Sequence, residues 1–184
     1  GILSTSDIKN GMRVRRVTTL DTIRQITENP KLLRFCEFII AATGDKPFPI
    51  YKQLDLMKIA NLAQHFWAID FRDGVDNCPK FVFSGTHIDD HYGMNITGKC
   101  FEEIYVEDDF ERTIRGNYYQ VCLQKKISYT KRLAHYYNDR IDKYKTIEAM
   151  LFPCSSDGES IDYGVGYVEY KFGNSPSEKI FHLI

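Results

Sequence analysis

Residues 81–103 read FVFSGTHIDDHYGMNITGKCFEE, and the pattern changes from strand to helix within this stretch. Residues 80–84 are rich in Phe and Val, which is typical of a β-strand. Thr86 follows, and its hydroxyl is a suitable N-cap for a short helix predicted over residues 87–92. Gly93 then fits a C′ position with positive φ. The stretch therefore predicts a strand that leads directly into a short helix.

Further strands are predicted on both sides of this stretch. Residues 65–72 alternate between apolar and polar side chains, and the segment DGVDNCP joins them to residues 80–84 in a hairpin. Downstream, Asp108 or Asp109 is expected to cap a helix that runs to about Gln124. Three more strands are predicted at residues 127–137, 143–153 and 160–172. Strands separated by helices indicate an α+β fold, here a five-stranded antiparallel sheet with helices on one face.

The chain before this sheet is predicted to be helical. Residues 44–49 are rich in Gly and Pro, which breaks any helix that enters them. Residues 31–42 carry apolar side chains at three- and four-residue spacing, which predicts an amphipathic helix, and an earlier helical turn is expected over residues 20–28. We therefore expect an N-terminal helical extension at 1–46, the main domain at 47–174 and a C-terminal tail at 175–184.

Three stretches of the sequence resemble a PAS domain, in particular the bacterial PAS-like family of short, largely uncharacterised proteins. Residues 49–71 resemble its lead-in helix and first strand. Residues 81–103 resemble its aromatic second strand and the short helices that follow, and residues 151–167 resemble its Asp-Gly turn and small-residue final strand. The resemblance implies a five-stranded sheet with helices cupping one face. It also implies sensing or protein interaction in signalling, often through dimers, without catalysis.

The last predicted strand carries two glycines at alternate positions, Gly164 and Gly166. Alternate residues share one face of a strand, so these positions leave a hollow on the sheet. Either a neighbouring ring or helix fills the hollow, or a small-molecule ligand does. The other candidate pocket residues are Trp67, Phe83, Phe101, Tyr118, His135 and Met150. An ordinary aromatic core is the alternative interpretation, because apolar rings usually pack against each other.

The sequence does not match the cofactor motifs of PAS domains. Flavin-binding light-sensing members have a reactive Cys near Cys100, between Asn and Arg, but here Lys precedes it and Phe follows. Haem-binding members take a His from the long helix, and residues 109–124 contain none. His87 and His91 lie one helical turn apart, as a shared metal would require, but no third ligand is identified and we expect a solvated polar face. We therefore predict no metal, haem or photoactive flavin site.

The composition limits the partners and the cellular locations that we expect for this chain. The chain has 24 Lys+Arg and 25 Asp+Glu, a net charge of -1, which argues against nucleic acid as an obligate partner. Its 5 cysteines include no C-x-x-C pair, so we predict reduced thiols that mostly lie in the core. Neither a secretory signal pattern nor a membrane-length apolar run is visible. These features predict a cytoplasmic protein without membrane contact.

The functional prediction is a non-catalytic PAS-type sensory or protein-interaction module in bacterial signalling, with a small apolar or aromatic molecule as its candidate ligand. The helix at residues 31–42 is the expected contact element, through which the chain forms a homodimer or binds a signalling protein. Alternatively, this helix folds back and caps the sheet. The alternative function is a small enzyme or carrier acting on an apolar metabolite, with a reacting group beside His65 or His135.

Overall fold

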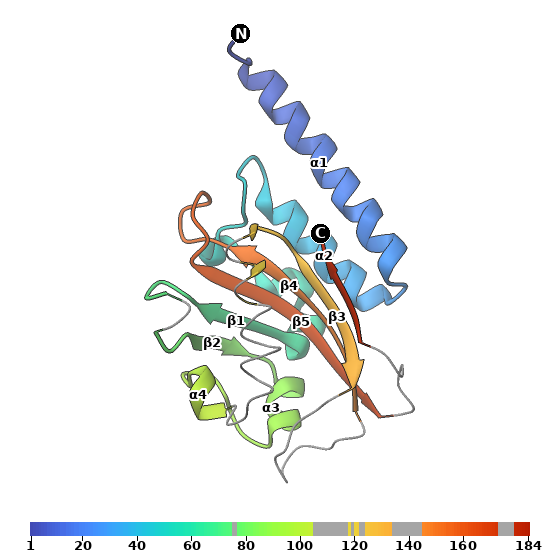
Figure 1. Ribbon diagram of the computed structural model, residues 1–184, viewed down its shortest axis with the longest axis vertical. Helices are drawn as coiled ribbons and strands as arrows, with labels where there is room; N and C mark the ends of the chain where they lie inside the picture. Colours follow the sequence, from blue (N-terminus) through green and yellow to red (C-terminus); the bar gives the residue numbers. More distant parts are fainter. Residues whose placement is uncertain (75–76, 105–117, 119, 122–123, 134–144, 173–178) are drawn as a thin grey trace.

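The computed structural model describes residues 1–74, 77–104, 118, 120–121, 124–133, 145–172 and 179–184. Its centre is a 6-stranded sheet in the order β2-β1-β5-β4-β3-β6, with every neighbouring pair antiparallel (Figure 1). The strands are β1 (Phe66–Asp70), β2 (Lys80–Ser84), β3 (Ser128–Leu133), β4 (Lys145–Cys154), β5 (Tyr163–Phe172) and β6 (Ile180–Leu183). The α+β, PAS-like fold is thus confirmed.

The sheet has one strand more than the five that the sequence predicted. β6 lies within residues 175–184, where we expected a tail, and it extends the sheet beyond β3. Two backbone hydrogen bonds close this pairing, from Ile127 N to Ile184 O at 3.0 Å and from Ile184 N to Ile127 O at 2.8 Å. The division of the chain into domains stays a prediction.

Helices cover both faces of the sheet. The cup face, as we call it, carries α3 (Thr86–Tyr92) and α4 (Phe101–Ile104), together with Tyr118 and Val121. The back face carries α1 (Thr5–Ile26), α2 (Pro30–Thr43), η1 (Tyr51–Gln53) and η2 (Leu56–His65). Each face has its own apolar cluster, because the alternate side chains of every strand point to opposite faces.

The apolar side of α2 is buried against the back face. Leu32, Phe35, Cys36 and Ile39 are completely buried, and Phe35 contacts the rings of back-face residues such as Tyr167, with centroids 5.6 Å apart. The sequence predicted the helix correctly, but its expected role as an outer contact element is wrong. The alternative, in which the helix folds back and caps the sheet, describes the structure, because a stripe this apolar is stabilised by burial.

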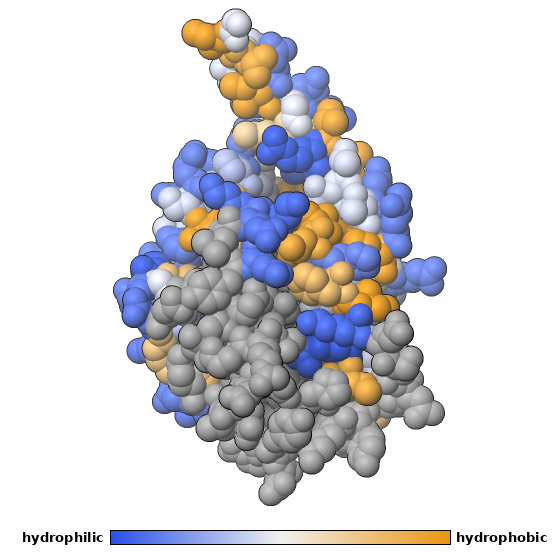
Figure 2. Space-filling model, in the orientation of Figure 1, coloured by the Kyte–Doolittle hydropathy of each residue, from blue (hydrophilic) through white to orange (hydrophobic). Residues whose placement is uncertain are grey.

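α1 is longer than the helical turn predicted over residues 20–28, and only Ile23 among its residues is fully buried. Its outer half projects from the body (Figures 1 and 2), where apolar side chains meet solvent. These exposed apolar residues are Ile2, Leu3, Ile8, Val14 and Val17. Ser4 caps the helix by accepting a hydrogen bond from Asp7 N at 3.1 Å.

The joint between α1 and α2 is built from polar groups. Asn29 caps α2 by accepting from Lys31 N and Leu32 N, and Pro30 occupies the first helical turn, where a missing N–H costs nothing. The Asn29 amide also donates to Glu148 on β4, at 2.8 Å. The joint therefore holds both helices to the centre of the back face.

Glu148 is buried at this joint but fully hydrogen-bonded. One of its carboxylate oxygens accepts from Thr27 Oγ1 at 3.0 Å and from the Tyr129 hydroxyl at 2.6 Å. Its cross-strand neighbour Glu169 accepts from the Tyr167 hydroxyl at 2.6 Å. Burial by itself raises the pKa of Glu169, but hydrogen bonds from Tyr167, Lys171 and Asn29 outweigh it and bring the pKa below its ordinary value. The back face thus satisfies its buried polar groups internally.

The short helix α3 begins differently from the prediction. Its N-cap is Gly85, without a side-chain hydrogen bond, so Thr86 does not cap it. A Cβ on Gly85 would lie 2.2 Å from Gln64 O, because η2 packs closely against this turn, and only glycine fits. The positive φ predicted for Gly93 is confirmed, with φ at 68°. The helix predicted to run to Gln124 lies mostly outside the described residues.

Candidate functional site

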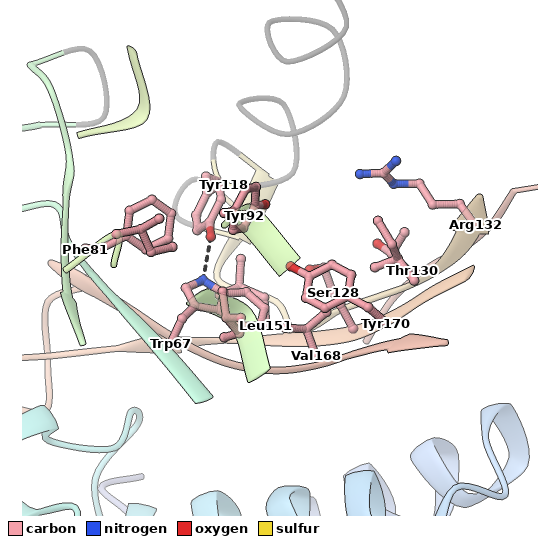
Figure 3. A pocket seen from close by; sticks show the side chains of 14 residues that line it. Trp67, Phe81, Tyr92, Tyr118, Ser128, Thr130, Arg132, Leu151, Val168 and Tyr170 are labelled. Atoms are coloured by element: carbon pink, nitrogen blue, oxygen red, sulfur yellow. Dashed lines mark hydrogen bonds between the residues drawn. The ribbon is translucent and has the colours of Figure 1, made fainter. Parts of the chain in front are cut away.

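A cavity of about 90 Å³ lies between the cup face of the sheet and α3. Figure 3 shows the sheet separating this cavity from the N-terminal helices. Its lining consists of Trp67, Phe81, Ile88, Tyr92, Ile96, Tyr118, Ser128, Thr130, Arg132, Ile147, Ala149, Leu151, Val168 and Tyr170. Most of these side chains are apolar or aromatic, and the polar exceptions are concentrated on β3.

The floor of the cavity consists of three rows of side chains that run across the strands. The pairings place Ser128 beside Leu151, Leu151 beside Gly166 and Gly166 beside Trp67. The second row is Thr130, Ala149 and Val168, and the third is Arg132, Ile147 and Tyr170. Each row therefore begins with a polar residue on β3 and continues over apolar or aromatic residues.

Trp67 forms the opposite end of the first row. Its ring lies over Gly166, where an added Cβ would come within 2.3 Å of the indole. Its Nε1 donates to the Tyr118 hydroxyl at 2.6 Å, so a buried polar tip has its partner (Figure 3). The hollow that the sequence predicted at the glycines is thus filled by neighbouring rings, Trp67 at Gly166 and Phe71 at Gly164. The open cavity lies farther along the sheet, toward β3.

The predicted pocket residues divide between the two faces. Trp67 and Tyr118 line the cavity, and Phe101 packs on Tyr118, with ring centroids 4.9 Å apart. Met150 and Phe83 belong to the back-face cluster instead. His135 lies outside the described residues. Whether any of these residues binds a ligand stays a prediction.

The polar residues Ser128, Thr130 and Arg132 were not among the candidates. They occupy alternate positions of β3, and in Figure 3 they form a row along one side of the cavity. Their spacing was visible in the sequence. The same strand carries Lys131 among its apolar residues, however, so the pattern did not reveal which set faces inward.

A second cavity, of about 180 Å³, lies on the back face beside η1 and η2. It is lined by Tyr51, Leu54, Leu56, Phe66, Trp67, Ala68, Phe83 and Val165. Although this cavity is larger, its described lining is almost entirely apolar and includes no cluster of polar side chains that could orient a ligand. We therefore take the cup cavity as the candidate site.

His87 and His91, which lie one helical turn apart, pack between α3 and β5. Among the residues that the structure describes, no group of three His, Cys, Asp or Glu side chains could hold a metal ion. The expectation that His87 and His91 face water is wrong for His91, which is buried and stacks on the Tyr170 ring with centroids 3.5 Å apart. His87 Nε2 accepts from Tyr170 N at 3.1 Å. Both imidazoles therefore contribute to packing between α3 and β5.

His65, which the alternative enzyme function invoked, does not line the cup cavity. Its ring lies near Tyr167, with centroids 5.0 Å apart, and its Nδ1 is 3.0 Å from Val168 O. Burial lowers the pKa of His65, although the contact with Val168 opposes this effect. These contacts hold η2 against the sheet, and they do not favour the enzyme alternative.

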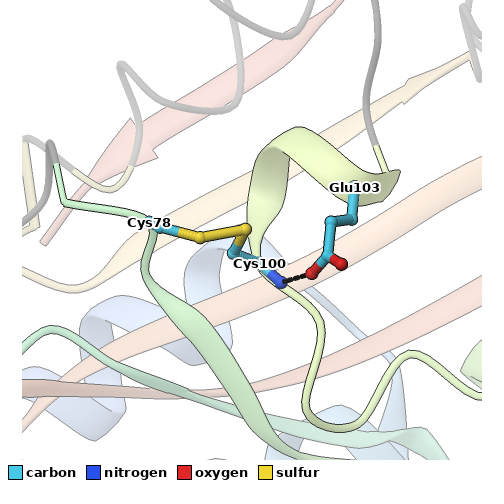
Figure 4. Close-up of a disulfide and its surroundings, with 3 residues drawn as sticks. All are labelled: Cys78, Cys100 and Glu103. Carbon is cyan, nitrogen blue, oxygen red and sulfur yellow. Dashed lines mark hydrogen bonds between the residues drawn. A yellow bond between two sulfur atoms is a disulfide. The ribbon is translucent and has the colours of Figure 1, made fainter.

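Two cysteines are joined, which corrects the prediction of reduced thiols. Cys78 and Cys100 form a disulfide at the rim of the cup face (Figure 4). The sequence did not reveal this pairing because the two cysteines lie 22 residues apart. The bridge between Lys80 and Cys100 and the backbone hydrogen bonds of Phe81 with Gly98 and Lys99 bring them together. Glu103 accepts from Cys100 N at 2.8 Å and so caps the start of α4. The disulfide makes Cys100 part of a cross-link.

The remaining described cysteines behave as predicted. Cys36 and Cys154 are free, buried members of the back-face cluster. Burial raises the pKa of Cys154 to about 12. Cys122 lies outside the described residues. The absence of haem and of a photoactive flavin stays a prediction. The disulfide shows only that the sulfur of Cys100 is bonded to Cys78.

Within the described part of the chain, no helix has the length and apolar character needed to cross a bilayer. A search with family models found no match, and no curated protein matches the sequence.

Several solved structures are similar in fold. A Rhodobacter sphaeroides LOV protein is 11% identical with a TM-score of 0.43, over 63% of this chain and 68% of that one. A sensory box sensor histidine kinase from Vibrio cholerae is 14% identical with a TM-score of 0.39, over 62% and 85%. A Vibrio cholera VqmA–ligand–DNA complex is 16% identical with a TM-score of 0.39, over 64% and 51%. Likenesses this distant carry no argument about ligand, partner or activity, and the PAS-like fold rests on the sheet and helices described above.

Proposed function

We propose that this chain is a non-catalytic sensory or protein-interaction module of the bacterial PAS-like family that binds a small molecule in the cup cavity. The observation that carries the proposal is the polar row on β3 facing an otherwise apolar cavity. An ordinary core keeps such positions apolar, because a buried hydroxyl without a partner costs free energy. A pocket with few, well-placed polar groups is typical of ligand sites.

The sole tryptophan provides the test, because Trp67 lines the cavity. We expect its fluorescence to change on titration with a panel of small aromatic and aliphatic metabolites. Ala149 lies in the middle of the floor, so Ala149→Phe should fill the cavity and abolish the response. Ala41→Phe on the exposed surface of α2 is the matched control.

Native mass spectrometry of the purified protein would show a co-purified ligand that Ala149→Phe loses. Equal responses from wild type and Ala149→Phe would contradict the proposal.

The output of this module is proposed to pass through a homodimer or a signalling partner. Because α2 is occupied by the sheet, the outer half of α1 is the better contact element, and its exposed apolar side chains support this choice. Light scattering of the full chain and of a variant lacking residues 1–11 tests it. An identical mass for both would contradict a role for this segment in self-association.

The proposal keeps the cytoplasmic location that the sequence predicted, and this location conflicts with the Cys78–Cys100 disulfide. Disulfides are rare in a strongly reducing compartment such as the cytoplasm, so this bond favours an oxidising compartment instead. Thiol labelling of Cys78 and Cys100 in whole cells would decide between a cytoplasmic and an oxidising compartment, since a cytoplasmic protein should carry both residues as thiols. Full protection from labelling would contradict the proposed location.

A further inference from the structure

Two hydroxyl side chains of the cup cavity have no hydrogen-bond partner in the described part of the chain. Ser128 is 3% exposed and Thr130 is 6% exposed, and both line the cavity. Among the residues that the structure describes, neither side-chain oxygen is hydrogen-bonded, whereas the buried Thr27 on the back face binds Glu148. Neither oxygen is among the fully enclosed polar atoms of the described residues, so both hydroxyls face the open space of the cavity. Two such groups side by side indicate that something polar enters this part of the cavity.

Positive charge lies at the same end of the cavity. Arg132 follows Thr130 at the next inward position of β3, and Figure 3 shows its guanidinium reaching back over the cavity. Lys179 precedes β6 directly, and the pairing of Ile180 with Lys131 places it beside Arg132. The pKa of Lys179 is lowered by its partial burial and by the nearby charge of Arg132. Arg132 Nη1 also donates to Leu133 O at 3.1 Å, but a guanidinium has five N–H donors, so an anion beside these two cations is still favoured.

The rest of the cavity is suited to an apolar group. Opposite the β3 row lie Trp67, Leu151 and Val168, whose side chains are almost completely buried. The volume of about 90 Å³ limits the guest to a small molecule. A charged group alone would leave this apolar surface without a partner, and a purely apolar guest would leave the hydroxyls unpaired.

We infer that the cup cavity, if it binds a ligand as proposed above, takes a small carboxylate with an apolar or single-ring body. The carboxylate accepts hydrogen bonds from Thr130, Ser128 and the Arg132 guanidinium, which matches carboxylate geometry. The body of the molecule lies on Leu151 and Val168 and reaches toward Trp67. Each end of the ligand thereby meets the end of the cavity that matches its chemistry.

Benzoate and its uncharged counterpart benzamide test this inference on the full chain. The two share one ring and nearly one shape but differ in charge. We expect benzoate to bind about 10-fold more tightly than benzamide by calorimetry and Trp67 fluorescence, since hydrogen bonds to charged groups are the stronger ones. Arg132→Gln should weaken benzoate binding about 10-fold and leave benzamide within about 2-fold. Arg15→Gln, on the exposed surface of α1, is the matched control and should change neither affinity.

A second variant keeps the inference testable if Arg132→Gln does not fold. Arg132→Lys keeps the charge and should retain a preference for benzoate, although a weaker one because the bidentate geometry is lost. Benzamide binding as tightly as benzoate to the wild type, or an unchanged preference in Arg132→Gln, would overturn the inference. The proposed function would still stand in that case if Ala149→Phe abolished binding of both compounds. If neither compound binds, the inference of a carboxylate ligand is wrong. The titration with the metabolite panel then tests whether the cup cavity binds any ligand.

Discussion

The two faces of the sheet bury polar side chains to a similar degree but use them differently. On the back face, Glu148 accepts hydrogen bonds from three neighbours, and Glu169 from Tyr167 and Lys171. On the cup face, the side chains of Ser128 and Thr130 line a cavity without such bonds among the described residues. A polar group with internal partners stabilises the fold, whereas one without them is available to a ligand. The contrast indicates that the polar groups of the back face contribute to stability, and it supports the proposal that the cup face binds a ligand.

The strongest test of this contrast removes the cover of the back face. Deleting residues 1–44 takes away α1 and α2 and exposes the apolar cluster beneath Phe35 and Ile39. We expect aggregation or loss of cooperative unfolding, because exposed apolar surface of this kind drives association. Deleting residues 1–11, which are all exposed, should leave thermal unfolding nearly unchanged. A well-folded monomer lacking residues 1–44 in size-exclusion chromatography would show that the back face does not need its helices.

The next largest effect is expected from Glu148→Leu. The substitution leaves the Tyr129 hydroxyl, the Thr27 hydroxyl and the Asn29 amide without their acceptor. We expect a loss of about 4 kcal/mol in the free energy of unfolding, since breaking a buried charged network is costly. Glu159→Leu, at an exposed loop position, is the control and should change stability by about 0.5 kcal/mol or less. Equal stability of both variants in urea denaturation would mean that the network contributes nothing.

The cysteines extend the contrast, because those of the back face are free and those of the cup rim are bonded. Cys78→Ser opens a loop of 22 residues, which lowers the free energy of unfolding by about 3 kcal/mol in the chain-entropy view. Dithiothreitol should lower the stability of the wild type by a similar amount and leave Cys78→Ser unchanged. If the reductant affects neither protein, the cross-link does not stabilise the cup rim.

Much of this architecture could be predicted from local patterns. The alternation in β1, the amphipathic spacing in α2 and the turn at Gly93 each depend on residues close together in the chain, and all three were predicted correctly. The five main strands followed from the same kind of signal. These features form because local side-chain spacing matches the period of a strand or a helix.

The candidate site could not be predicted in the same way, because its parts meet only through long-range pairing. Which side of β3 faces the cavity depends on its register with β4, so Ser128 and Thr130 were not distinguished from Lys131. Met150 was placed on the wrong face for the same reason. The pairing of β6 and the Cys78–Cys100 disulfide likewise join segments that carry no local signal for each other.

The smallest expected effects give the sharpest comparison of the two faces, because the same substitution can be made on each. Thr27 and Thr130 are 5% and 6% exposed. Thr27→Val removes a hydrogen bond to the Glu148 carboxylate, so we expect a loss of about 2 kcal/mol in the free energy of unfolding. Thr130→Val replaces a hydroxyl that has no partner among the described residues, and stability should change by about 0.5 kcal/mol or less.

Chemical denaturation of both variants measures this difference, and benzoate titration of both gives the second half of the comparison. Thr130→Val should weaken benzoate binding, because a hydroxyl that would donate to the carboxylate is lost, whereas Thr27→Val should leave it unchanged. If the two variants lost equal stability, the Thr130 hydroxyl would have a structural partner. The division between a stabilising back face and a binding cup face would then fail at the residue that supports it most directly.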